Sequence, residues 1–165
     1  MARFFPREVI DWSEERLHPL RAFALRTIEP AGITGVVLRL WRTVLLTSDN
    51  ALLVVLGILA GAAFLCAMLT WHLGHYPLRR WPTRALAFLL TEVTIELGMS
   101  SMLIVFRLER LGSTVAGFRD WWSLAAQTIW QRTLVVLLFT LLLALVVQLV
   151  RRLVDQRAAP ARLPG

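Results

Sequence analysis

Three long runs of apolar residues limit the folds that are open to this chain. They cover residues 51–71, 85–106 and 133–150. At 1.5 Å per residue, about 20 helical residues cross the roughly 30 Å hydrocarbon core of a bilayer. The third run is shorter, but arginines border it at both ends, and their long side chains can reach the headgroups. The sequence therefore predicts three transmembrane helices.

Composition supports a membrane protein and argues against a soluble enzyme. Hydrophobic residues make up 57% of the 165 residues and charged residues 18%, against roughly 45–50% and about 25% in soluble domains. This hydrophobicity also argues against disorder. We find no motif for a nucleophilic triad, a phosphate loop, a redox cysteine pair or a metalloprotease. We therefore expect no enzymatic activity, no metal site and no catalytic residue.

The positive charge of the chain points to lipid and not to nucleic acid. The net charge is +7, and all 18 basic residues are arginines. Most of them border the apolar runs, where they can contact lipid headgroups. Tryptophan side chains also suit this layer. We expect interfacial contacts from Arg39, Trp41, Arg42, Arg79, Arg80, Trp81, Trp121, Trp122, Arg151 and Arg152.

The first 48 residues have a different pattern, in which charged and aromatic residues are mixed. Pro6, Pro19 and Pro30 are expected to cut residues 3–29 into short helices at most. Residues 33–46 are apolar but include two arginines, which predicts an amphipathic helix in the membrane interface. A re-entrant or tilted fourth span is the alternative. We thus predict an all-α integral membrane protein with an N-terminal amphipathic arm (1–48), a three-span domain (49–152) and a flexible C-terminal tail (153–165).

Two carboxylates inside the second apolar run are the most informative feature of the sequence. Glu92, Glu96 and Ser100 are spaced four residues apart and share one helix face. A carboxylate at the bilayer centre costs at least about 2.5–3.5 kcal/mol, so this face should point towards protein, water or a partner. One interpretation is an ion pair, with Arg39 or Arg42 if the arm dips inward, and otherwise with another subunit. The other is a proton or cation path in which one carboxyl stays protonated.

The first apolar run contains two further candidates. Gly57 and Gly61 form a GxxxG pattern, and Ala63 and Ala67 add small residues, which predicts close helix packing within the chain or across a complex. At the end of this run His72 and His75 could ligate haem or a chlorophyll. The alternative for both histidines is hydrogen bonding to headgroups, water or backbone.

These features favour a non-catalytic accessory subunit or assembly factor of a larger membrane complex, such as a respiratory or photosynthetic one. Its expected partners are other integral membrane subunits and lipids, with no nucleic acid. A homo-oligomeric conductor of ions or protons, built on Glu92 and Glu96, is the first alternative. A haem- or pigment-binding subunit is the second. The expected location is the bacterial inner membrane.

Overall fold

A computed structural model describes residues 19–111 and 114–158, and this part of the chain is mostly helical. The rest of the predicted arm, 1–18, and of the predicted tail, 159–165, lies outside the described residues. The helices are α1 (Pro19–Leu25), α2 (Ile28–Leu45), α3 (Ala51–Leu73), the 3-10 turn η1 (Leu78–Arg80), α4 (Trp81–Val105) and α5 (Trp121–Ala158).

Three helices are long and apolar enough to cross a membrane, as the three apolar runs predict. They are α3, α4 together with η1, and α5. The last is much longer than its apolar run, because the helix begins at Trp121 and ends at Ala158. Residues 153–158, expected to belong to a flexible tail, are therefore helical. The prediction of a wholly α-helical chain needs one correction. Between α4 and α5, β1 (Arg110–Leu111) and β2 (Thr114–Val115) form a short antiparallel pair.

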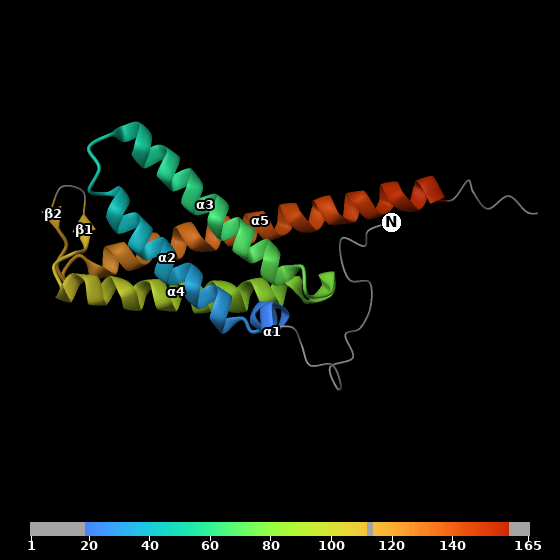
Figure 1. The fold of residues 1–165 in the computed structure, drawn as a ribbon, viewed down its shortest axis with the longest axis horizontal. Coiled ribbons are helices and arrows are strands. Elements are labelled where there is room, and N and C mark those ends of the chain that lie inside the picture. The colour runs from blue at the N-terminus through green and yellow to red at the C-terminus, as the bar shows by residue number, and fades with distance from the viewer. Residues whose placement is uncertain (1–18, 112–113, 159–165) are drawn as a thin grey trace, which may run out of the picture.

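The helices form two antiparallel hairpins that cross each other (Figure 1). One hairpin is α2–α3 and the other is α4–α5, with β1 and β2 beside the end of α4. Side chains from four helices meet in the apolar core, where Leu38 of α2 and Leu65 of α3 pack with Phe88 of α4 and Val136 of α5. Residues 28–45 thus belong to a helical bundle.

The second helix is a single helix of 18 residues, and its proline does not interrupt it. The break between the short α1 and α2 falls at Arg26 and Thr27, just before Pro30, and Pro30 itself lies in the first turn of α2. There its missing N–H would have had no helical partner. One buried face of α2 includes Ala31, Gly35 and Arg39, which are spaced four residues apart. This face lies against α4.

Gly35 is the point where α2 approaches α4 most closely. A Cβ atom at this position would lie 2.6 Å from the backbone oxygen of Glu92 and 3.2 Å from the backbone nitrogen of Glu96. Backbone atoms inside a packed helix cannot give way as a side-chain tip can. Only glycine therefore allows this spacing, which brings the next turn of α2 onto the acidic face of α4.

The predicted glycine pair of α3 also packs within the chain. Leu45 covers Gly57, and Trp41 lies over Gly61, while the indole Nε1 of Trp41 donates a 2.9 Å hydrogen bond to the carbonyl of Gly57. Ala63 and Ala67 lie elsewhere on α3, where they are exposed. The small residues of this helix thus divide between a contact with α2 and an exposed face.

Replacing Gly35 should separate α2 from α4. We expect Gly35→Ala to lower the free energy of unfolding by about 1–3 kcal/mol, the usual cost of overpacking. Gly98→Ala is the matched control, because nothing lies within 4 Å of a Cβ there, and it should gain up to about 1 kcal/mol of helix propensity. Thermal unfolding in detergent measures both. Equal stability of the two variants would contradict the close contact.

Candidate functional site

The acidic face of α4 is closed inside the bundle. Glu92 and Glu96 are both 0% exposed, and Ser100, one turn further on, is 1% exposed. The i,i+4 spacing puts all three on the side of α4 that meets α2 and α5. The acidic face therefore points towards protein. This is one of the three surroundings expected for it, because carboxylates exposed to lipid would cost free energy.

Arg132 of α5 pairs with both carboxylates. Its Nε donates to Oε2 of Glu96 at 2.8 Å, and its Nη2 donates to Oε1 of the same carboxylate at 3.2 Å. The same Nε lies 3.2 Å from Oε1 of Glu92. Such two-point pairing fixes the angle between two planar groups. Arg132 thus ties α5 to the middle of α4.

Arg39 of α2 approaches the same face from the other side. Its Nη2 donates a 2.6 Å hydrogen bond to Oγ of Ser100, and its Nη1 lies 3.8 Å from Oε1 of Glu96. Its Nη2 also lies 2.6 Å from Oε2 of Glu109. The placement of Arg39 among headgroup contacts is therefore wrong, because this side chain is 0% exposed. The alternative expectation, an internal partner for the carboxylates, describes Arg39 correctly.

Glu109 reaches Arg39 because the chain reverses sharply after α4. Arg107 adopts a left-handed conformation with φ of 58°. The amide of Leu108 then donates to the carbonyl of Leu103, and the amide of Arg107 to that of Ile104. This is the Schellman arrangement, in which glycine usually takes the left-handed position. The turn brings Glu109 back beneath the end of α4, where it is 1% exposed.

Together these groups form one buried ionic cluster, which we define as Arg39, Glu92, Glu96, Ser100, Glu109 and Arg132. It connects α2, α4, α5 and the turn after α4. Glu92 is the least satisfied member, because neither of its carboxyl oxygens accepts a hydrogen bond from the described residues. The cluster holds two guanidinium groups and three carboxyl groups.

Two members of the cluster were missed by the sequence analysis. Glu109 lies in a connecting segment, where an acidic residue normally faces water, so no pattern distinguishes it. Arg132 did carry a signal. It lies about three turns into α5, and Glu96 about two and a half turns before the end of α4. In an antiparallel hairpin these positions are at nearly the same level.

His72 anchors the chain before α2 and is not placed as a ligand. Its Nδ1 donates a 2.7 Å hydrogen bond to the carbonyl of Ala24, and its Nε2 lies 3.4 Å from Oγ1 of Thr27. Both nitrogens of this buried ring therefore already face partners in the protein. His75 lies in the turn after α3, and its Nδ1 donates a 2.8 Å hydrogen bond to the carbonyl of Trp71 in the last turn of that helix. The arrangement corresponds to the backbone-bonding alternative.

Other side chains reinforce this anchor. The hydroxyl of Tyr76 donates to the carbonyl of Leu25 at 2.5 Å, and the guanidinium of Arg84 lies 4.4 Å from the centre of the tyrosine ring. Burial raises the pKa of Tyr76. The indole of Trp81 donates to the carbonyl of Tyr76. Trp81 is therefore a core residue, and its expected place at the membrane surface is wrong, because it is 2% exposed.

Most of the other expected headgroup residues lie at the surface. Arg42 and Trp121 are both half-buried. The other six are exposed: Trp41, Arg79, Arg80, Trp122, Arg151 and Arg152. Exposure alone does not test a contact with lipid. The headgroup contacts of these residues remain predictions.

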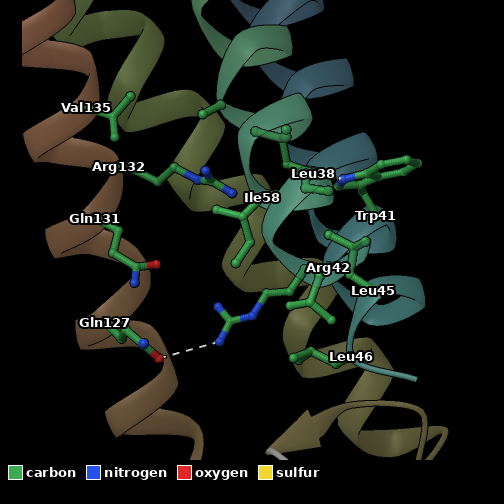
Figure 2. Close-up of a pocket in the computed structure, with 14 residues that line it drawn as sticks. Leu38, Trp41, Arg42, Leu45, Leu46, Ile58, Gln127, Gln131, Arg132 and Val135 are labelled. Carbon is green, nitrogen blue, oxygen red and sulfur yellow. Dashed lines mark hydrogen bonds between the residues drawn. The ribbon is translucent and has the colours of Figure 1, made fainter. Parts of the chain in front are cut away.

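A groove of about 400 Å³ lies between α2, α3 and α5 (Figure 2). Arg42 and Arg132 point into it, together with Gln127 and Gln131 of α5. Arg42 donates a long hydrogen bond of 3.4 Å to Oε1 of Gln127. Burial lowers the pKa of Arg42 and so do the nearby Arg39 and Arg132, while Glu96 and Glu109 partly offset them. The walls of the groove are apolar side chains of α2 and α3.

Comparison with protein-family models, curated proteins and solved structures gives no match. Among the described residues, no group of three or more histidines, cysteines, aspartates or glutamates is placed to hold a metal ion. The role of the protein therefore has to be argued from its own geometry.

Removing the guanidinium of Arg39 should destabilise the whole bundle. We expect Arg39→Met to cost about 3–5 kcal/mol of unfolding free energy, since it leaves Glu109 buried without its partner. Arg119→Gln, at an exposed position, should change it by less than about 0.5 kcal/mol. Chemical unfolding in detergent checks both values.

A double variant tests the origin of this loss. Arg39→Met combined with Glu109→Met removes both members of the closest pair, so it should recover part of the stability. A double variant as unstable as the sum of the two single variants would show that the pair does not interact.

Proposed function

We propose that this protein is a non-catalytic accessory or assembly subunit of a larger integral membrane complex. Its partners would be other membrane-spanning subunits, and its location the bacterial inner membrane. A respiratory or photosynthetic complex is the expected host. The proposal rests on how the chain distributes its polar and apolar side chains.

The observation that carries the proposal is the extent of exposed apolar surface on α3 and α5. Large side chains are exposed around much of α5, whose C-terminal part extends beyond the N-terminal end of α4 (Figure 1). Helices that are apolar on all sides are typical of a membrane or of the core of a larger assembly. Lipid and neighbouring helices together would cover Leu137, Leu138, Leu141, Leu142, Leu145, Val146, Leu149 and Val150.

The first apolar helix offers a surface for close approach by a partner. Ala63 and Ala67 are exposed on α3, and small residues let a second helix come near enough for backbone contact in lipid. Gly57 and Gly61 cannot serve this purpose, because Leu45 and Trp41 already lie against them. A partner of α3 would therefore meet the alanine face and not the glycine face.

The interior supports a structural role. The carboxylates that could have lined a pathway are paired with arginines from two other helices. Buried ionic groups that pair in this way fix helix positions. One sequence argument for a partner subunit is thereby weakened, since Glu96 finds its partners within the chain. The proposal now depends on the apolar surface.

Purification from native membranes tests the proposal. We expect mild-detergent extraction of the tagged full chain to retain a stoichiometric set of unlike membrane proteins, identified by mass spectrometry. Ala63→Trp and Ala67→Trp should weaken that set without unfolding the chain, because both positions are exposed. Thr94→Trp, at an exposed position of α4, is the control. A particle that contains this chain alone would contradict the accessory role.

One observation favours a second candidate, a homo-oligomeric proton conductor. Glu92 has no hydrogen-bond donor among the described residues, and its ionic partner Arg132 borders the groove. The cluster also has one more carboxyl than guanidinium groups, so one proton would make it neutral. A carboxyl that can gain and lose this proton is what a proton path requires.

Glu92→Gln separates the two candidates. Because Arg132 keeps both of its hydrogen bonds to Glu96 when Glu92 is neutral, we expect the variant to change the unfolding free energy by about 1 kcal/mol at most. Under the accessory role, liposomes that contain wild type or variant should show the same proton flux as empty liposomes. Proton flux that is lost in Glu92→Gln and kept in Glu29→Gln, a surface carboxylate control, would support conduction.

A further inference from the structure

The groove between α2, α3 and α5 presents cationic groups while the carboxylates lie behind them. Arg132 lines it with a side chain that is 18% exposed, whereas the side chains of Glu92 and Glu96 are 0% and 1% exposed. Arg42 makes no ion pair with any residue that the structure describes. A molecule bound in the groove would therefore contact the guanidinium groups of Arg42 and Arg132 and not the carboxylates.

Arg42 is a cation to which the described residues offer no direct ion pair, although Glu96 and Glu109 act on it from further away. It is half-buried, and its one described side-chain partner is the neutral amide of Gln127 at 3.4 Å. Figure 2 shows its guanidinium pointing across the groove towards α5. A partly buried cation with a weak neutral partner is stabilised by an anion that can accept hydrogen bonds at short range.

The rest of the groove has the character of a site for an acyl chain. Leu38 of α2, Val54 and Ile58 of α3 and Val135 of α5 form its walls. Arg42 faces Gln127 in one part of the groove, and Arg132 lies further along, beside Val135 and Leu38 (Figure 2). Cationic and apolar side chains thus line the groove together. A volume of about 400 Å³ is within the usual range for small-molecule sites.

We propose that this groove binds one anionic phospholipid, whose phosphate lies between Arg42 and Arg132 and accepts hydrogen bonds from Gln127 and Gln131. One acyl chain lies along Leu38, Ile58 and Val135. Basic pockets between membrane helices bind anionic headgroups on the same principle. A zwitterionic lipid fits less well, because its own cation would face the two guanidiniums.

Native mass spectrometry of the full chain tests the proposal. The protein is extracted in a neutral detergent that contains equal amounts of phosphatidylglycerol and phosphatidylcholine, and the retained lipids are counted. We expect one phosphatidylglycerol per chain. Arg42→Gln should lower the ratio of phosphatidylglycerol to phosphatidylcholine by about tenfold, since it removes a charge-assisted contact. Arg119→Gln, an equal charge change outside the groove, should leave the ratio unchanged.

A second variant tests the apolar part with the charges intact. Ile58 is 61% exposed, so Ile58→Trp should leave the fold unchanged while it fills the groove. We expect this variant to lose the retained lipid. It also keeps the test decisive if Arg42→Gln fails to fold.

Several results would overturn the proposal. One is an equal lipid ratio in wild type and Arg42→Gln. Another is displacement of the lipid by millimolar sodium phosphate, which would assign the site to free phosphate. A dimer that depends on Arg42 would assign the groove to a second copy of the chain.

The inference rests on the membrane location within the proposed function, and the experiments separate the two. A chain that does not sediment with membranes overturns the proposed function. A chain that does so, but shows no preference for phosphatidylglycerol, overturns the lipid site alone.

Discussion

The close contact between α2 and α4 at Gly35 is the constraint on which the rest of the bundle depends. It allows Arg39, one turn later, to reach Glu96, Ser100 and Glu109. Without that contact the acidic face of α4 would keep Arg132 but lose its second cation. A chain this short can bury two carboxylates in the middle of a long apolar helix because two other helices each supply an arginine.

Arginine serves three different purposes in this fold, and depth inside the bundle distinguishes them. Arg39 is fully buried and takes part in folding, since its partners all belong to the chain. Arg151 and Arg152 are exposed at the far end of α5. Arg42 lies between these extremes, half-buried beside a groove. A partly buried cation without a direct ion pair adds little to stability, because burial costs free energy. This position of Arg42 is consistent with the binding role proposed for it.

Hydropathy predicts the three long helices, and the i,i+4 spacing of Glu92, Glu96 and Ser100 predicts that they share one inward face. Both can be read from the sequence because they are local properties. The role of Arg39 depends on which way α2 faces, and an i,i+3 pair of arginines does not show that one points inward. Gly35 attracted no notice because a single glycine in an apolar segment has no repeating pattern. The position of Glu109 depends on the left-handed turn at Arg107. A glycine there would have indicated such a turn, but an arginine does not.

Two groups of polar contacts hold α2 in place, one at the ionic cluster and one around His72 and Tyr76. The ionic cluster fixes it through Arg39, while His72 and Tyr76 hold the carbonyls of Ala24 and Leu25 just before it. Both sets of contacts use groups that would be costly in lipid if they were left unpaired. In a membrane, apolar side chains gain little from contact with each other over contact with lipid. Polar pairs and close backbone packing at Gly35 therefore determine where α2 lies, and the groove between α2, α3 and α5 follows from that position.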